Sequence, residues 1–191
     1  MVRAYHLILT CYGFWLPNDP RGSYSSRVWS HAIREFGEAT KINTNRSVAH
    51  RPHDHAARRA AKRALLRPSV RFNGKQAQLI AKGLAEIVDR NTLVVHACAV
   101  MPDHVHLVVE RHATIKAEGM TQRFKAKITQ RLNAADLGFG YTPWCKGRWI
   151  VYLNTPEDVE RATRYVEQNP IKAGLRPQRW SFVQPSRNRD G

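Results

Sequence analysis

The stretch Met101-Pro102-Asp103-His104-Val105-His106-Leu107-Val108-Val109 predicts a tight turn followed by a short apolar strand that carries two histidines. Side chains alternate along an extended chain, so His104 and His106 lie on one face of this strand and most of its apolar residues lie on the other. Two imidazoles on one face can bind one divalent metal ion. The same pattern also fits a strand end whose histidines merely contact water, so the pair alone does not define a site.

The residues around this strand predict an antiparallel sheet. Residues 92–100 are predicted to form a strand that pairs with residues 104–110 through the Pro102-Asp103 turn. Stretches rich in residues that favour strands predict a first strand at 4–12 and a last one at 148–153. The histidine pair therefore begins the second arm of a hairpin.

Two amphipathic helices flank the hairpin in the sequence. Asn73 can cap a helix over about 74–90, in which apolar residues recur at three- and four-residue spacing. After His112, a second helix carries an apolar stripe at strict four-residue spacing, formed by Met120, Phe124, Ile128 and Leu132. Each helix can bury one face against the sheet.

A third helix has clear start and stop signals. Thr155 fits the N-cap position and Pro156 the first helical position. Because a proline disfavours helical geometry in the residue before it, Pro170 predicts that this helix ends near Asn169.

The order of these elements predicts an α+β fold. It fits a ferredoxin-like antiparallel sheet with packed helices and an extra closing helix. We expect one domain over residues 1–191, with an insertion at about 20–72 and a basic tail at about 176–191. Within the insertion, residues 54–66 predict an Arg-rich helix that either touches phosphates or presents a solvated basic face.

Composition points to a polyanionic partner. Lys and Arg number 31 against 15 acidic residues, which gives a formal charge of +16. This imbalance argues against a cytosolic enzyme of small molecules, and the interleaved aromatic residues favour nucleic acid over a ribosomal or membrane surface. No apolar run approaches the roughly 18 residues of a membrane span, and no secretory signal is evident, so we expect a cytoplasmic protein without a membrane partner.

Three scattered cysteines exclude one class of metal site. Cys11, Cys98 and Cys145 are few, odd in number and far apart. They argue against a disulfide framework and against a closed, cysteine-based zinc site, and free thiols are the expectation.

A tyrosine and an asparagine of the third helix complete the candidate site. At roughly 100° per residue, Tyr165 and Asn169 lie together on the flank of the buried stripe, one turn apart. Tyrosine is a weak nucleophile, so its attack on a phosphodiester needs a cation near the phosphate oxygens. The histidine pair, with Asn169 as a third ligand, would hold that cation. A tyrosine that only packs its ring fits the same spacing, and Tyr141 and Tyr152 are rival nucleophiles.

These motifs resemble those of a known family. His104-Val105-His106, preceded by Met101-Pro102-Asp103, resembles the His-hydrophobic-His motif of the HUH endonucleases. The stretch Tyr165-Val166-Glu167-Gln168-Asn169-Pro170-Ile171-Lys172-Ala173-Gly174-Leu175 resembles the tyrosine helix of the REP-associated tyrosine transposases, part of the superfamily of the smallest bacterial insertion-sequence transposases. Tyr5-His6-Leu7-Ile8 and Trp144-Cys145-Lys146-Gly147-Arg148-Trp149 resemble two further segments of these proteins. The resemblance covers most of the chain outside residues 20–72.

The resemblance implies the HUH endonuclease fold and a single-tyrosine DNA transposase that uses Mg²⁺ or Mn²⁺. Such enzymes cleave single-stranded or hairpin DNA to leave a 5′-phosphotyrosine and a free 3′-hydroxyl. Carried over to this chain, it makes Tyr165 the nucleophile and His104, His106 and Asn169 the metal ligands. The residues expected to bind DNA are Arg123, Lys125, Lys127, Arg131, Trp144, Lys146 and Arg148.

Three other functions stay open at this point. A replication-initiator or relaxase-type nickase would use the same chemistry, but it usually needs extra domains. A catalytically idle nucleic-acid-binding protein would bind through its basic surface, and its histidines would be remnants without a catalytic role. A zinc hydrolase is disfavoured because no glutamate accompanies the pair as a base. The sequence also leaves open whether the protein is a monomer or a homodimer and which DNA it recognises.

Overall fold

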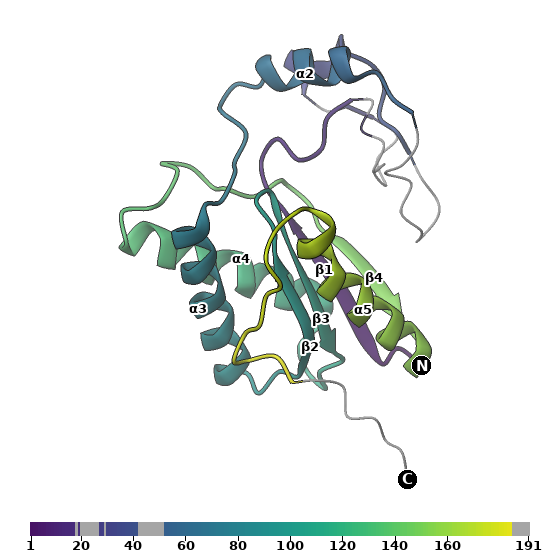
Figure 1. The fold of residues 1–191 in the computed structure, drawn as a ribbon, viewed down its shortest axis with the longest axis vertical. Coiled ribbons are helices and arrows are strands. Elements are labelled where there is room, and N and C mark those ends of the chain that lie inside the picture. The colour runs from purple at the N-terminus through teal and green to yellow at the C-terminus, as the bar shows by residue number, and fades with distance from the viewer. Residues whose placement is uncertain (18, 20–26, 29, 42–51, 185–191) are drawn as a thin grey trace. The chain divides into compact units, whose positions relative to one another are not determined.

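Four strands form one antiparallel sheet in the computed structural model of the chain, which describes residues 1–17, 19, 27–28, 30–41 and 52–184. The strands lie in the order β2-β3-β1-β4 (Figure 1), with bounds β1 Ala4–Thr10, β2 Val95–Val100, β3 His104–Glu110 and β4 Trp149–Leu153. Together with the helices between them, this order is the ferredoxin-like arrangement that the sequence predicts.

The strand register puts the histidines at the centre of the sheet. On one side of β3, Ile8 of β1 pairs with His106, and Thr10 pairs with His104. On the other side, Ala99 of β2 pairs with His106. His106 is therefore flanked by strands on both sides, and its pairing with Ala99 confirms the predicted hairpin.

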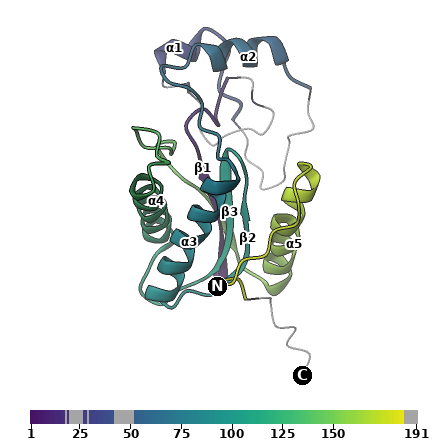
Figure 2. The ribbon, with the colours of Figure 1, turned by 60° about the vertical axis from the view of Figure 1, so that its left-hand side comes forward.

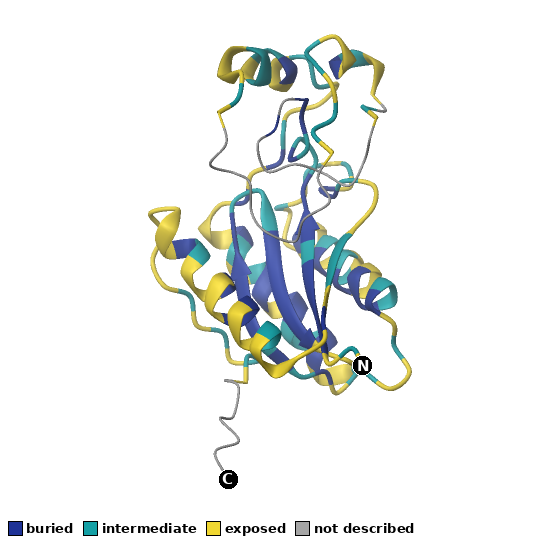
Figure 3. Ribbon diagram, turned by 90° about the vertical axis from the view of Figure 1, so that its right-hand side faces the viewer, coloured by how far each residue is buried: buried dark blue, intermediate teal, exposed yellow. Residues whose placement is uncertain are grey.

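Helices cover both faces of the sheet. Helices α3 (Gly74–Arg90) and α4 (Ala117–Ala134) pack together over one face, and α5 (Pro156–Lys172) packs over the other (Figure 2). The predicted stripe of α4 is fully buried, and the strands form the buried layer between the helices (Figure 3). Across the described residues, none of the helices has the length and apolar character to cross a membrane.

Two helices begin as the sequence predicts. The side chain of Asn73 accepts a hydrogen bond from the Gln76 backbone N–H (2.9 Å), and the side-chain oxygen of Gln76 accepts one from the Asn73 backbone N–H (2.9 Å). Thr155 caps α5 in the same reciprocal way with Asp158. These capping boxes satisfy backbone donors that a helix otherwise leaves unpaired in its first turn.

The predicted end of α5 is wrong. The helix continues through Pro170 to Lys172. Pro170 is buried one turn after the buried Val166, so it continues the buried stripe of the helix. Burial of the ring offsets the loss of one backbone hydrogen bond this close to the helix end.

The first two strands are shorter than predicted. β2 begins at Val95 rather than at residue 92, because Thr92 has a positive φ of 51° and closes a turn after α3. β1 ends at Thr10, since residues 11–14 form a turn in which the Phe14 N–H bonds to the Cys11 carbonyl. All three cysteines are free, as expected.

The chain separates into two compact units. One consists of Met1–Thr10 and Arg71–Gly191 and contains the sheet, and the other is Cys11–Val70. The second unit contains α1 (His31–Arg34) and α2 (His55–Arg63), with a small core of Leu16, Ile33 and Ala61. The predicted Arg-rich helix over 54–66 corresponds to α2, which Asp54 caps. Residues 18, 20–26, 29 and 42–51 of the first loop and predicted insertion, and 185–191 of the predicted tail, lie outside the described residues.

Candidate active site

The face of the sheet beneath α5 carries three histidines. His104 and His106 project from β3, and His6 projects from β1. The ring centroids of His106 and His6 lie 5.7 and 5.9 Å from that of Tyr165 on α5. The structure thus brings the predicted histidine pair and the predicted tyrosine together, although they are about sixty residues apart in the sequence.

The two predicted histidine ligands converge on one point. Nε2 of His104 lies 2.9 Å from Nε2 of His106. Two nitrogens bound to one octahedral ion at about 2.1 Å each would lie roughly 3 Å apart, so the pair fits a shared divalent ion. Among the described residues, no group of three or more His, Cys, Asp and Glu side chains is arranged to hold a metal. A metal here would therefore need other oxygen ligands besides the two imidazoles.

Asp103 orients His104. Its Oδ1 lies 2.6 Å from Nδ1 of His104. Because a carboxylate only accepts hydrogen bonds, the Nδ1 of His104 is the donor. In the neutral ring this leaves the Nε2 of His104 without a proton, which is the form that binds a metal.

His6 is a site residue whose role the sequence does not predict. Its Nε2 lies 2.9 Å from Nδ1 of His106, on the ring edge opposite to the one that faces His104. Only 7% of His6 and 3% of His106 are exposed. Alternation along β1 places His6 on a face with Ile8, but only the pairing of Ile8 with His106 shows that this face holds the other two histidines.

Burial keeps two of the histidines neutral. Desolvation, followed by the nearby charge of His104, lowers the pKa of His6 to about 4. Desolvation, followed by the charges of His104 and His6, lowers the pKa of His106 well below its usual value. At neutral pH both rings are therefore uncharged, as a ligand to a metal must be.

Tyr165 is accessible from solvent, and Asn169 lies one turn further along α5. The tyrosine is 38% exposed, although its ring packs edge-on against His106. The side-chain amide of Asn169 donates to the backbone carbonyl of Tyr165 (3.3 Å). This bond uses Nδ2 and leaves the carboxamide oxygen, which is the atom that would ligate a metal.

The rival tyrosines lie elsewhere. Tyr152 pairs with Tyr5 in the sheet register, and the two rings are in edge-on contact, 5.6 Å apart. Its hydroxyl faces Glu118 of α4, and the negative charge of that residue raises the pKa of Tyr152. Tyr141 lies in the loop after α4, against Phe139. Of the three candidate tyrosines, Tyr165 is thus the one whose ring contacts the histidines.

Most of the predicted DNA-binding residues of α4 already have protein partners. Glu86 of α3 binds both Lys127, at 2.8 Å, and Arg131. Arg123 donates to the side chain of Asn91 (3.4 Å). Lys125 donates to the carbonyls of Cys145 and Gly147 at 3.2 and 2.9 Å. These residues lie in the helix layer opposite to α5 and not beside the histidines (Figure 2).

The loop before β4 divides the remaining predicted residues. Trp144 is 6% exposed, and its indole N–H donates to the Lys125 carbonyl (3.1 Å), so it anchors the loop and offers no face to a base. Lys146 and Arg148 are exposed. The backbone N–H of Cys145 donates to the carbonyl of Thr10, and Thr10 pairs with His104. Lys146 and Arg148 follow directly in the sequence, so they lie near the end of the sheet that carries His104.

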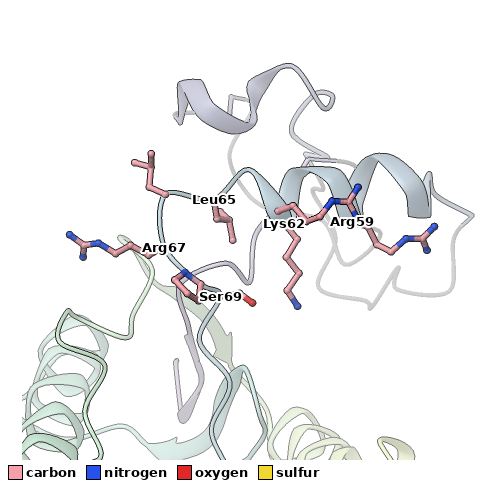
Figure 4. Close-up of a pocket in the computed structure, with 8 residues that line it drawn as sticks. Arg59, Lys62, Leu65, Arg67 and Ser69 are labelled. Carbon is pink, nitrogen blue, oxygen red and sulfur yellow. The ribbon is translucent and has the colours of Figure 1, made fainter.

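The second compact unit has a basic surface of its own. A hollow of about 590 Å³ beside the C-terminal end of α2 is lined by Arg59, Lys62, Arg63, Leu65, Leu66, Arg67, Pro68 and Ser69. In Figure 4 the side chains of Arg59, Lys62 and Arg67 point in different directions. They spread positive charge over this unit and do not converge on one anion.

Comparisons with known proteins find a matching family and similar solved structures. The family model for IS200-like transposases matches residues 65–169, a range that includes both strand histidines, Tyr165 and Asn169. A structure of a REP-associated tyrosine transposase bound to a REP hairpin is similar, with 17% identity and a TM-score of 0.45 over 54% of this chain and 59% of that one. A candidate transposase from Deinococcus radiodurans R1 shares 15% identity with a TM-score of 0.41 over 88% of this chain and 92% of that one. No curated protein matches the chain.

The match over residues 65–169 defines the class of protein. The chain belongs to the family of IS200-like transposases, enzymes that act on DNA.

Proposed function

We propose that this protein is a metal-dependent, single-tyrosine transposase that cleaves and rejoins single-stranded or hairpin DNA through a 5′-phosphotyrosine intermediate. One observation carries the proposal: the ring of Tyr165 packs on His106, and the Nε2 atoms of His106 and His104 converge to 2.9 Å. The tyrosine that we propose as nucleophile and the histidine pair that we propose as metal ligands are thus adjacent in a member of a transposase family.

The histidine pair would hold Mg²⁺ or Mn²⁺, with the carboxamide oxygen of Asn169 as a third ligand. Such an ion supplies positive charge that neutralises the phosphate oxygens during attack. The chain's own contribution is the orientation of its ligands. Asp103 fixes the ring of His104 with its proton on Nδ1 and not on Nε2, and burial keeps His106 neutral.

Tyr165 provides the nucleophile. Its Oη forms a bond to phosphorus, and the bond between phosphorus and the 3′ oxygen breaks. The phenol proton passes to a base in solution, and the leaving 3′ oxygen takes up a proton to become a hydroxyl. Rejoining is the reverse reaction with a new 3′-hydroxyl. The exposure of Tyr165 supports this role, because a phosphodiester must reach its hydroxyl.

Lys146 and Arg148 bind the DNA backbone in this proposal. Both are exposed and lie at the histidine end of the sheet, whereas the cations of α4 are engaged with Glu86, Asn91 or backbone carbonyls. Phosphate contacts of this kind position a strand without reading its sequence.

The proposal predicts a covalent adduct. With Mn²⁺ and a single-stranded or hairpin oligonucleotide, the wild-type protein should join to the 5′ end of the cleaved strand through Tyr165. We expect Tyr165→Phe to abolish the adduct, His104→Ala to abolish it while DNA binding persists, and Tyr152→Phe to leave it unchanged. Denaturing electrophoresis with a labelled oligonucleotide, followed by mass spectrometry of the linked peptide, measures each outcome.

Two results would contradict the proposal. An adduct that persists in Tyr165→Phe would assign the nucleophile to another residue. Cleavage in EDTA as fast as with Mn²⁺ would show that the reaction needs no metal. Wild-type protein that binds DNA tightly without forming an adduct on any such substrate would instead indicate a binding protein without cleavage activity.

A further inference from the structure

We propose that His6 is a positioning residue for the metal ligand His106, and that it works by changing the nitrogen that carries its own proton. The inference rests on the proposed function only in that His104 and His106 bind a metal. It assigns a role to a third histidine, which contacts neither the metal nor the DNA in this scheme.

The hydrogen bonds form one continuous chain. Asp103 contacts Nδ1 of His104 (2.6 Å), Nε2 of His104 contacts Nε2 of His106 (2.9 Å), and Nδ1 of His106 contacts Nε2 of His6 (2.9 Å). Each neutral imidazole has one donor and one acceptor, so the carboxylate at one end sets the direction of every bond.

Without a metal, the chain runs in one direction. Asp103 accepts from Nδ1 of His104, whose Nε2 then accepts from Nε2–H of His106. The Nδ1 of His106 therefore accepts from Nε2–H of His6. In this state His106 carries its proton on the nitrogen that a metal needs.

Metal binding reverses the last bond. To ligate through Nε2, His106 must carry its proton on Nδ1, and that N–H then points at Nε2 of His6. His6 accepts it only if its own proton is on Nδ1. Each of the two rings, His6 and His106, holds one proton before and after the change. In each ring solvent takes the proton from Nε2 and returns one to Nδ1, so no proton is gained or lost.

The surroundings of His6 suit this role. It lies on β1, whose register beside β3 fixes its position next to His106, and the two ring centroids are 5.0 Å apart. Its ring also packs edge-on against Tyr165, 5.9 Å between centroids. His6 thus contacts a proposed ligand and the proposed nucleophile. Imidazole can donate or accept at the same ring position, which an amide does only by rotating and a phenyl ring does not do at all.

The first test measures binding of Mn²⁺ alone to the full chain by electron paramagnetic resonance. We expect His6→Phe to raise the Kd about 10- to 100-fold, the usual effect of losing a partner behind a metal-bound histidine. His6→Gln should lose less affinity for Mn²⁺ than His6→Phe, because the glutamine carboxamide oxygen can accept a hydrogen bond from Nδ1–H of His106. The control is His96→Gln on β2, whose histidine faces Glu110 at the other end of the sheet, and it should bind Mn²⁺ as wild type does.

The second test reads the protons directly. In ¹⁵N-histidine NMR spectra at pH 8, His6 should be protonated on Nε2 without metal and on Nδ1 when Zn²⁺, a diamagnetic probe, occupies the site. A structural role alone would not move this signal. Circular dichroism and a thermal melt of each variant separate a local effect from failure to fold.

The outcomes distinguish the two proposals. Wild-type affinity for Mn²⁺ in folded His6→Phe, or an unchanged His6 tautomer on Zn²⁺ binding, would overturn the inference. Wild-type protein that binds neither ion would overturn the inference together with the metal site. Metal binding that depends on His6, in a protein that forms no DNA adduct, would support the inference and contradict the proposed cleavage activity.

Discussion

Three histidines belong to one hydrogen-bonded chain, yet each has different neighbours: His6, His104 and His106. His104 is next to a carboxylate, His106 lies between two rings, and His6 has only 7% of its surface exposed. The electrostatic consequence is that two of the three rings strongly resist protonation. A metal ion would therefore meet His106 as a neutral ring, whose one proton has to move from Nε2 to Nδ1 before the metal can bind.

The same burial predicts a dependence of stability on pH. Unfolded histidines take up protons near pH 6.5, whereas the pKa of folded His6 is about 4. Between these values the unfolded state binds more protons, so acid favours unfolding. In EDTA, the free energy of unfolding should fall as the pH drops from 7 to 5, by up to about 1.4 kcal/mol per pH unit for each such histidine. Urea denaturation at several pH values measures this slope.

His6→Gln is the control for that slope. Glutamine does not titrate, so the variant should lose stability less steeply with acid than wild type. Equal slopes in the two proteins would show that His6 is protonated equally in the folded and unfolded states.

At the scale of the element, the capped first turn of α5 helps to position Tyr165, the proposed nucleophile. Thr155 accepts a hydrogen bond from the Asp158 N–H (3.1 Å), and Glu157 and Asp158 place negative charge in the first turn. Both features favour a helix that starts at a defined residue. The helix then packs on the sheet through Ala162 and Val166, and this packing fixes the position of Tyr165 relative to the sheet.

Removal of the cap should destabilise the protein modestly. We expect Thr155→Ala to lower the free energy of unfolding by about 1 kcal/mol, the typical value for loss of an N-cap side chain. Thr155→Ser keeps the hydroxyl and should restore most of that loss. Chemical denaturation of the three proteins at one pH gives the comparison, and equal stability of the alanine and serine variants would mean that the cap contributes nothing.

Features of individual elements could be predicted from the sequence, because they depend on neighbours in the chain. The caps at Asn73 and Thr155 and the apolar stripe of α4 are local patterns, and the structure confirms them. The end of α5 could not be predicted, because the backbone preference of the residue before a proline is weaker than the gain from burying the ring of Pro170.

Features that depend on register or on packing between helices could not be predicted. The contact between His6 and His106 follows from the pairing of Ile8 with His106, which no local pattern specifies. Glu86 neutralises Lys127 and Arg131 only because α3 and α4 lie side by side. The roles of Tyr165, His104, His106 and Asn169 stay predictions, although the first three residues do lie together.

At the scale of the whole molecule, a formal charge of +16 favours DNA binding. The Lys and Arg side chains should contribute unequally, because some of them are already paired within the protein. We expect Lys146→Ala with Arg148→Ala to weaken binding of single-stranded DNA. The slope of log Kd against log salt should fall by about 1.4, or about 0.7 for each phosphate that the variant no longer neutralises. The matched double variant is Lys127→Ala with Arg131→Ala. It should change the slope less, because Glu86 already balances part of that charge.

Fluorescence anisotropy with one labelled oligonucleotide at several NaCl concentrations measures both variants. A larger decrease in slope for the Lys127 and Arg131 variant would place the DNA on the helix layer of α3 and α4, away from the histidine face.

The central position of β1 and β3 has a consequence for how the site fails. All three histidines project from these two strands, and each strand has a hydrogen-bonded neighbour on both sides. Fraying at a sheet edge leaves this pair of strands intact, so the histidines separate only when the sheet itself comes apart. The three histidines thus depend on the sheet for their arrangement, and a molecule that retains β1 and β3 also retains the two proposed histidine ligands and His6 side by side.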